Sequence, residues 1–89
     1  MSYKLAIRKE AHKYLAKNPQ LKKRVVEWLK DALDDPYSNH DGTLKGIADD
    51  EPIIYKKRIG DYRVLFHVFD EQLVLEIIRI RPRGQAYKG

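Results

Sequence analysis

The second half of the chain contains three strand-like segments that are joined by very short turns. The segments span residues 53–59, 62–69 and 73–81, and Gly60-Asp61 and Asp70-Glu71 separate them. Apolar and polar residues alternate within each segment, which is typical of strands with one buried face. Strands joined by so few residues run antiparallel. This half of the chain therefore predicts an antiparallel sheet, and the first half has to cover one of its faces.

The first half predicts a short strand followed by two helices. Residues 3–8 alternate like a strand, and residues 9–17 place apolar side chains on one helical face. Asn18-Pro19 is a typical helix start, because asparagine caps helices and proline is tolerated at the first position. The helix that follows carries one apolar stripe, made of Leu21, Val25, Trp28, Leu29, Ala32 and Leu33. We expect the polar segment 37–46 to be a loop.

The predicted fold is a single α+β domain over residues 1–89, in the order β-α-α-β-β-β. A helical pair would cover one face of a twisted, mostly antiparallel sheet. The chain has no cysteine, which excludes disulfides, thiolate nucleophiles and cysteine-bound metals. No apolar run approaches the roughly 18 residues of a membrane span, and the N-terminus lacks the apolar core of a signal peptide. We therefore expect a cytoplasmic protein without membrane contact.

Alternation along the strands predicts which side chains share a face of the sheet. We expect the helices to cover Tyr62, Val64, Phe66, Val68, Val74, Ile78 and Ile80. Leu75 and Ile77 then fall on the open face. The same face receives most cations of the second half, which are Lys56, Arg58, Arg63, Arg79, Arg81 and Arg83. Glu76 is an exception on the helix side, and such an exception is typical of a β-bulge or a sheet margin.

The open face is therefore strongly basic. The whole chain has 18 Lys and Arg residues against 13 Asp and Glu residues, which gives a net charge of +5. Gathering like charges on one face costs self-repulsion, so the pattern favours a phosphate-binding surface over an ordinary solvated face. His67 falls on the same face and is a further candidate contact.

Lys, Arg and Tyr provide most of the chemistry that the sequence offers. No pair of the three histidines has metal-ligand spacing, and no glycine-rich phosphate loop or nucleophile elbow occurs. We therefore expect no metal and no cofactor. RNA is still a suitable substrate, because it carries its own nucleophile in the 2′-hydroxyl. Arginine can stabilise the phosphorane, and a lysine can take the 2′ proton if neighbouring cations lower its pKa.

Three segments resemble those of the RelE/ParE toxin superfamily. The segment Arg58–Phe66, with the sequence Arg-Ile-Gly-Asp-Tyr-Arg-Val-Leu-Phe, is similar to the signature hairpin of the superfamily. Leu44-Lys45-Gly46 is similar to the leucine-x-glycine element that precedes this hairpin. Residues 81–88 resemble the C-terminus of archaeal-type RelE toxins. The resemblance covers nearly the whole chain and implies the toxin of a type II toxin–antitoxin system.

A RelE-like toxin is a metal-independent endonuclease that cuts mRNA in the ribosomal A site, by attack of a 2′-hydroxyl on the adjacent phosphate. The resemblance implies that Lys56 is a candidate base and that Arg63 orients the scissile phosphate. It implies that Arg83 stabilises the transition state or the leaving group, and that Tyr87 stacks on or orients a substrate base. Further RNA contacts are expected from Arg58, Arg79, Arg81, Lys57 and His67.

Two positions depart from the RelE pattern. Ile54 stands where RelE toxins have a second lysine, which weakens the cationic cluster. Pro82 stands where many relatives have histidine or lysine, and it fits the archaeal-type pattern.

The resemblance also implies partners, namely a RelB-like antitoxin, a ribosome of the 70S type and mRNA. A heteromeric toxin–antitoxin complex is expected. Two alternatives stay open. One is a ParE-like toxin that poisons DNA gyrase without cleaving RNA, and the other is an inactive relative that serves as a binding module. Neither alternative requires Lys56, Arg83 and Tyr87 together.

Overall fold

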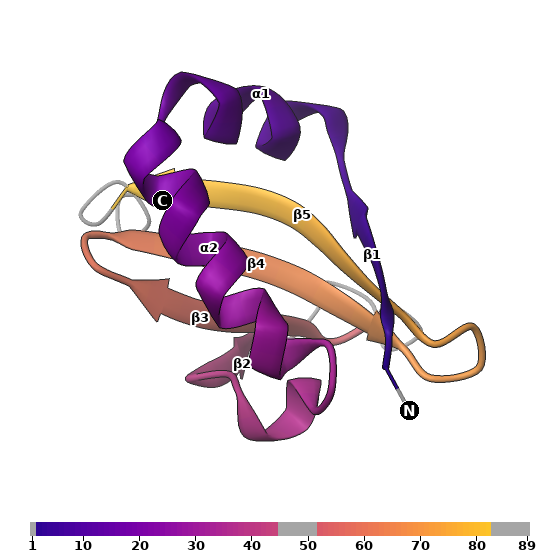
Figure 1. Cartoon of the computed structure of the whole chain (residues 1–89). Coiled ribbons are helices and arrows are strands. Elements are labelled where there is room, and N and C mark those ends of the chain that lie inside the picture. Colours follow the sequence, from indigo (N-terminus) through magenta and orange to yellow (C-terminus); the bar gives the residue numbers. More distant parts are fainter. Residues whose placement is uncertain (1, 45–51, 83–89) are drawn as a thin grey trace.

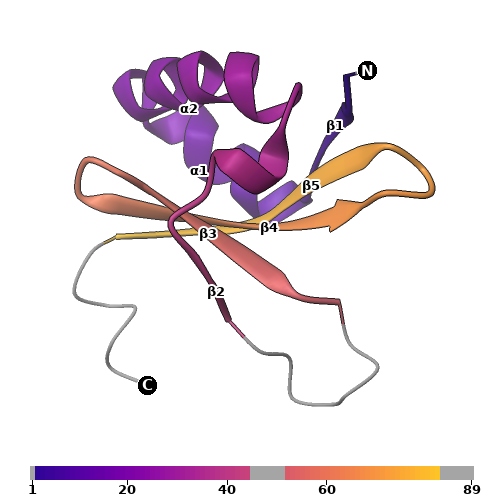
Figure 2. The ribbon, with the colours of Figure 1, turned by 90° about the horizontal axis from the view of Figure 1, so that it is seen from below.

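The computed structural model describes residues 2–44 and 52–82. The elements, in chain order, are β1 (Lys4–Ile7), α1 (Lys9–Lys17), α2 (Pro19–Ala32), the 3₁₀ helix η1 (Pro36–Ser38), β2 (Gly42–Leu44), β3 (Ile54–Ile59), β4 (Tyr62–Phe69) and β5 (Val74–Pro82). The strands form one sheet in the order β1-β5-β4-β3-β2. Both α-helices lie on one face of this sheet, as Figures 1 and 2 show. The predicted α+β fold and its mostly antiparallel sheet are thereby confirmed, with one strand added.

The sheet is antiparallel except at one edge. β3, β4 and β5 form the two predicted hairpins. β1 returns beside β5 and runs parallel to it, with Lys4 opposite Val74 and Ile7 opposite Ile77. This pairing brings Arg8, the residue after β1, next to the middle of β5, where its backbone N–H donates to the carbonyl oxygen of Ile77 at 2.9 Å.

The segment 37–46 is not entirely the loop that its polar composition predicts. Gly42–Leu44 forms β2 and pairs with β3, with Gly42 opposite Lys56 and Leu44 opposite Ile54. A strand of three residues is too short for a period of two to appear in the sequence. The structure therefore corrects this prediction, and the correction matters because β2 forms one wall of the open face.

The two helices pack on the sheet with the stripes that their sequences predict. In α2 the buried residues are Leu21, Val25, Trp28, Leu29 and Ala32. The ring of Trp28 lies 5.2 Å from that of Phe66 between centroids, and the indole N–H donates to the carbonyl oxygen of Asn39 at 2.8 Å. The hydrogen bond removes the cost of burying the indole nitrogen. Neither α-helix is long and apolar enough to cross a membrane.

A β-bulge in β5 changes which residues face the helices. Leu65 lies opposite Arg79, but the next residue, Phe66, lies opposite Ile77, so Ile78 has no partner in β4. One extra residue inverts the alternation of side chains. Leu75 and Ile77 are therefore in the core, at 0% exposure each, and the prediction that they lie on the open face is wrong.

The bulge corrects three further face assignments. The alternation placed Val74 and Ile78 against the helices, and both assignments are wrong, because these residues alternate with the buried Leu75 and Ile77. Glu76 likewise faces away from the core, and its carboxylate lies 3.5 Å from the guanidinium of Arg8. The exceptional position of Glu76 in the predicted pattern was thus a sign of the bulge itself.

Candidate functional site

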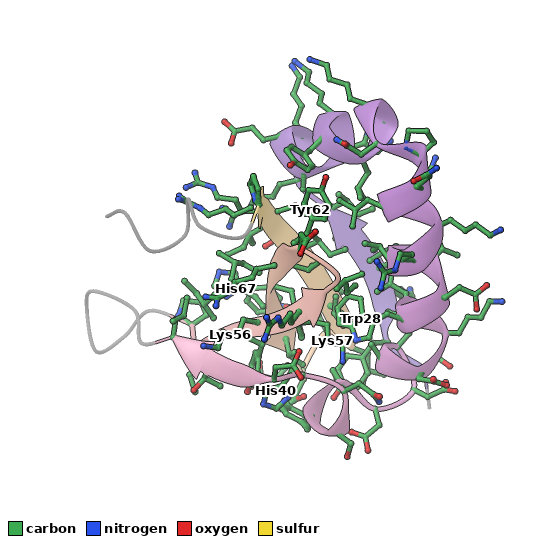
Figure 3. All side chains as sticks on the ribbon, turned by 90° about the vertical axis from the view of Figure 1, so that its left-hand side faces the viewer. Trp28, His40, Lys56, Lys57, Tyr62 and His67 are labelled. Carbon is green, nitrogen blue, oxygen red and sulfur yellow. The ribbon has the colours of Figure 1, made fainter. Side chains whose placement is uncertain are left out.

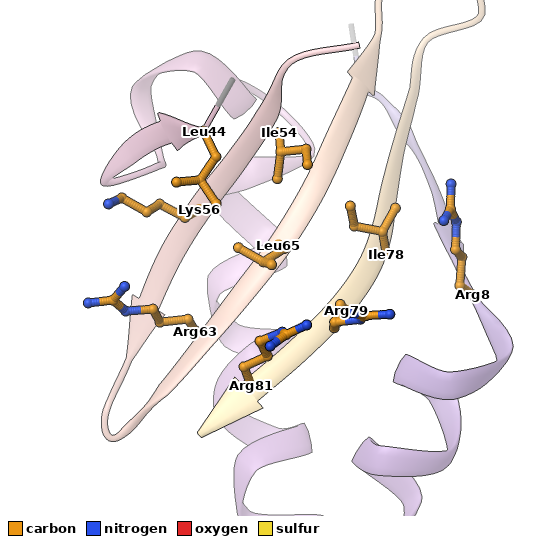
Figure 4. Close-up of a pocket in the computed structure, with 9 residues that line it drawn as sticks. All are labelled: Arg8, Leu44, Ile54, Lys56, Arg63, Leu65, Ile78, Arg79 and Arg81. Atoms are coloured by element: carbon orange, nitrogen blue, oxygen red, sulfur yellow. The ribbon is translucent and has the colours of Figure 1, made fainter. Parts of the chain in front are cut away.

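The open face of the sheet contains a pocket of about 520 Å³. Its lining combines four aliphatic residues with five cations, namely Leu44, Ile54, Leu65 and Ile78 with Arg8, Lys56, Arg63, Arg79 and Arg81. Figure 4 shows Leu44 and Ile54 at the upper end, Leu65 and Ile78 in the middle, and the cations along the other sides. The pocket therefore offers an apolar floor inside a basic rim.

The strand register explains how the sequence builds this pocket. Lys56 of β3 lies opposite Leu65 of β4, and Leu65 lies opposite Arg79 of β5. Two pairs further along, and thus on the same face, Arg63 lies opposite Arg81. The bulge then adds Ile78 to the floor, whereas regular alternation would have buried it. Three neighbouring strands and one irregularity thus bring these side chains together.

The cations of the pocket are close to one another, and Arg8, Lys56, Arg79 and Arg81 are poorly neutralised within the described part of the chain. Arg58 lies opposite Arg63, and Arg63 opposite Arg81, and like charges in directly opposed positions destabilise a sheet. Arg8 and Arg79 have acidic neighbours, Glu76 at 3.5 Å and Glu10 at 3.9 Å, but these pairs are largely exposed and contribute little. In residues 2–44 and 52–82 no ion pair involves Lys56 or Arg81. Such a surface is suited to an external anion.

A smaller hollow of about 150 Å³ adjoins the pocket and is lined by Asp41, Lys56, Arg58 and Arg63. Asp41 forms two hydrogen bonds with the backbone of β3. Its carboxylate accepts a hydrogen bond from the Arg58 backbone N–H at 2.6 Å, and its own N–H donates to the carbonyl oxygen of Lys56 at 2.7 Å. Sequence reasoning did not identify Asp41, because the pair Asp41-Gly42 is also the mark of an ordinary turn.

Most of the described residues that the sequence singled out lie together. Lys56, Arg63, Arg79 and Arg81 line the pocket, and Arg58 lines the adjoining hollow. Arg83 and Tyr87 lie outside the residues that the structure describes. Sequence reasoning missed Arg8, Leu44 and Ile78 as members of the site. Arg8 and Leu44 arrive through the pairing of the edge strands, which no local pattern reveals.

Lys57 and His67 do not line the pocket. Lys57 lies opposite the buried Val64, and its ammonium is 3.8 Å from the carboxylate of Asp41. His67 is 8% exposed, and its Nδ1 lies 3.1 Å from the carbonyl oxygen of Ile53. Both can be located in Figure 3, together with Lys56. The hydrogen bond of His67 accounts for its burial without any ligand.

The arrangement is suited to binding phosphate rather than metal. The planar forks of arginine residues hold phosphate oxygens in pairs, and a lysine adds a point charge. In the described ranges no group of three or more His, Asp or Glu residues is placed to hold a metal ion. The aliphatic floor can additionally take an apolar group of the same ligand, such as the face of a base or an aliphatic side chain.

Comparison with known proteins gives a consistent result. Residues 5–87 match the family model described as the ParE toxin of the type II toxin–antitoxin system parDE. No curated protein matches the sequence. Among solved structures, the archaeal RelE of the RelE–RelB complex from Pyrococcus horikoshii is 29% identical, with a TM-score of 0.78 over 96% of this chain and 99% of that one.

Two bacterial structures agree. The RelBE2 toxin–antitoxin complex of Mycobacterium tuberculosis matches at 25% identity and a TM-score of 0.74, over 93% of this chain and 100% of that one. The RelBE complex of E. coli matches at 24% identity and a TM-score of 0.71, over 91% and 96% of the two chains, and supports the fold. The family model and these structures together show that the chain belongs to the RelE/ParE superfamily of toxins of type II toxin–antitoxin systems.

Proposed function

We propose that this toxin is a ribosome-dependent endonuclease that cleaves mRNA in the A site. The observation that carries the proposal is the meeting of Lys56, Arg63, Arg79 and Arg81 in one pocket on the open face of the sheet. These are residue types that bind a phosphate and stabilise the additional negative charge of its transition state. The substrate supplies the nucleophile, so no metal or cofactor is required.

In the proposed reaction the 2′-oxygen attacks the adjacent phosphorus, and the bond from phosphorus to the 5′-oxygen breaks. The products are a 2′,3′-cyclic phosphate and a 5′-hydroxyl, whose oxygen takes up a proton from water. Arg63 and Arg81, opposite each other on β4 and β5, would hold the phosphate oxygens. Lys56 is the candidate base for the 2′ proton. We further propose that Arg83 stabilises the leaving 5′-oxygen and that Tyr87 stacks on a nucleobase of the substrate.

The proposal includes a ribosome because the pocket lies on the open face of the sheet and does not enclose the RNA. Cleavage requires the 2′-oxygen, the phosphorus and the 5′-oxygen to lie in line, and free RNA adopts this geometry rarely. The ribosome would hold the mRNA in that geometry. The proposed location is therefore the cytoplasm, where ribosomes and mRNA occur.

A RelB-like antitoxin is the proposed protein partner. The similar structures from Pyrococcus horikoshii and Mycobacterium tuberculosis are toxin–antitoxin complexes. The pocket favours an acidic amphipathic segment, because its rim is basic and its floor is made of Leu44, Ile54, Leu65 and Ile78. Such a segment would cover the cations that the RNA needs and would thereby neutralise the toxin in a heteromeric complex.

A second candidate function is a ParE-like toxin that poisons DNA gyrase. It is favoured by the family model, whose description names the ParE toxin. A gyrase-directed toxin does not require an RNA-cleaving set of cations. The two functions therefore differ in what they demand of Lys56 and Arg63.

Primer extension on an mRNA in a reconstituted translation reaction tests the proposal. The wild type should cut at A-site codons only when ribosomes are present, and Lys56→Gln should abolish the cuts. Lys57→Gln removes the same charge from the adjacent position, which lies away from the pocket, and should retain them. Intact mRNA at a dose that stops cell growth would contradict the proposal, and gyrase-dependent DNA cleavage would then support the second candidate.

A further inference from the structure

The helical layer carries a second group of cations. Lys9, Lys13 and Lys17 are spaced four residues apart along α1, and Lys22 and Lys23 follow in the first half of α2. All five side chains belong to exposed residues. We call these five residues the helical lysine surface. Glu10 is the only acidic residue between Arg8 and Val26, and it lies 3.9 Å from Arg79 of the sheet.

The helical lysine surface lies on the opposite side of the molecule from the pocket. Both helices cover one face of the sheet, whereas the pocket opens on the other (Figures 2 and 4). At 100° per residue, Lys9, Lys13 and Lys17 fall on the side of α1 opposite to the buried Ala11 and Leu15. They therefore point away from the sheet, and one extended strand of RNA cannot occupy this surface and the pocket together.

Most of these lysines lie where positive charge does not stabilise a helix, and Lys17, in the last turn of α1, is the exception. Like charges four residues apart repel each other on a helix surface, and α1 is only nine residues long. The beginning of a helix favours acidic residues, but the first turn of α2 has none and Lys22 and Lys23 follow it. Apart from Lys17, the charges therefore do not serve the fold, and a binding role explains them better.

The lysines also have no partners of their own. In residues 2–44 and 52–82, none of the five takes part in an ion pair or a side-chain hydrogen bond. Lys30, further along α2, differs because it pairs with Glu27 at 3.4 Å. Acidic residues gather instead beyond the end of α2, at Asp34 and Asp35. The charges are thus separated by sign along the helical layer.

The surface chemistry indicates which polyanion fits. On the two helices, Val26 is the one exposed large hydrophobic residue, no Phe, Tyr or Trp is exposed, and His12 is the single exposed ring. Single-stranded nucleic acid is usually held by aromatic stacking, and a protein helix by several apolar anchors. Neither is available here. Flexible lysine ammonium groups alone suit the phosphate backbone of a double-helical RNA, which is bound without base recognition.

We propose that the helical lysine surface is a second RNA-binding site, which binds the phosphate backbone of folded, double-helical RNA. The inference rests on the proposed function, because a ribosome consists largely of such RNA. The surface would hold the toxin on the ribosome while the pocket on the opposite face takes the mRNA. The toxin would then bind RNA at two sites with different tasks, one for affinity and one for cleavage.

Fluorescence anisotropy with a short RNA duplex, recorded over a range of salt concentrations, tests the inference without requiring cleavage. Lys13→Gln/Lys17→Gln should weaken duplex binding about tenfold and lower the salt dependence by up to about 0.9 in log–log slope for each lysine. Lys4→Gln/Lys30→Gln removes the same charge from exposed positions outside the surface and should change affinity less than about twofold. Circular dichroism checks that all variants keep their helices.

Three results would overturn the inference. One is an equal loss of affinity in the two double variants, since net charge alone would then explain binding. Another is a duplex affinity that falls in the Lys56→Gln variant and stays unchanged in the Lys13→Gln/Lys17→Gln variant. The third is tight binding of polyglutamate through the same lysines in preference to the duplex, which would assign the surface to an acidic protein.

The proposed cleavage and this inference fail in different ways. A toxin that cuts no mRNA but binds the duplex through its helical lysines would contradict only the cleavage. A Lys13→Gln/Lys17→Gln variant that binds the duplex and sediments with ribosomes as the wild type does, and still cuts mRNA, would contradict only the inference.

Discussion

Gly42 and Lys56 face each other across the β2–β3 pair, and a Cβ on Gly42 would lie 2.9 Å from Cε of Lys56. That distance is shorter than carbon atoms tolerate. The aliphatic part of the Lys56 side chain can therefore lie where it does only because residue 42 has no Cβ. Gly42 also has a φ of 153°, which side chains disfavour. The three-residue strand β2 thus determines where the candidate base of the pocket can lie.

Gly42→Ala should displace the Lys56 side chain and reduce cleavage. We expect mRNA cleavage in the translation reaction to fall about tenfold or more, since small misplacements of reacting groups have large effects. Backbone strain should lower the free energy of unfolding by about 1–3 kcal/mol. Thr43→Ala, at the exposed neighbouring position of β2, is the control and should retain cleavage. Full activity of Gly42→Ala would show that the position of Lys56 is unimportant.

Asp70 ties together three segments that are distant in the sequence. The hydroxyls of Tyr3 and Tyr37 both donate to its Oδ1, each at 2.6 Å. The hydrogen bond from Tyr3, followed by that from Tyr37, lowers the pKa of Asp70. Burial, followed by the bond to Asp70, raises the pKa of Tyr37. The β4–β5 turn is thereby joined to the N-terminus and to η1.

The lowered pKa of Asp70 makes stability depend on pH at the acidic end. A carboxyl with a lower pKa in the folded state stabilises the fold above its unfolded pKa of about 3.9, and this contribution is lost as pH falls through the folded value. Urea unfolding at pH 7 and near pH 3 should therefore show a smaller difference for Asp70→Asn than for the wild type. An identical difference in the two proteins would refute the role of Asp70.

The bulge in β5 gives a matched pair of variants. Ile77→Ala should lower the free energy of unfolding by about 2–5 kcal/mol, because Ile77 is fully buried. Ile78→Ala should cost less than about 1 kcal/mol, because that side chain lines the open pocket. Urea denaturation of both variants measures the contrast. A larger loss for Ile78→Ala would place the bulge elsewhere and restore the face assignment that regular alternation predicts.

The same bulge shows where sequence reasoning reached its limit in the fold. The helices and the two hairpins follow from apolar periods that extend over many residues, as the stripe from Leu21 to Ala32 illustrates. Alternation in β5 holds only on one side of the bulge, and the sequence does not reveal which residue is inserted. The only indication of the bulge in the sequence was Glu76, a charged residue that regular alternation places on the helix side. β2 was missed for a different reason, because three residues show no period.

Alternation along the strands was sufficient to predict the site residues wherever the strands are regular. Lys56, Arg63, Arg79 and Arg81 share a face because neighbouring strands are in register, and all four line the pocket. Lys57 illustrates the same alternation, because it is the next residue after Lys56 and its side chain points to the opposite face of the sheet. Asp41 and Arg8 join the site through pairing between distant segments, which depends on the whole fold rather than on any local pattern.

Asp41 is the acidic residue in the hollow beside the candidate base. Asp41→Ala removes the acceptor for the Arg58 N–H and should cost about 0.5–1.5 kcal/mol of stability, since that bond is exposed to solvent. The loosened edge of β3 should also reduce mRNA cleavage. Asp41→Asn keeps an acceptor oxygen and removes the charge, so it should restore most of the stability.

The two Asp41 variants separate position from charge in the hollow. If Asp41 acts by holding β3, cleavage should follow stability, with Asp41→Asn close to the wild type. If its charge matters, Asp41→Asn should change the affinity for RNA while its urea midpoint stays unchanged, because removal of a carboxylate strengthens the field of Lys56 and Arg63 on a phosphate. Asp61→Asn, at the β3–β4 turn, removes the same charge away from the hollow. A response of Asp61→Asn equal to that of Asp41→Asn would assign the effect to net charge and remove Asp41 from the site.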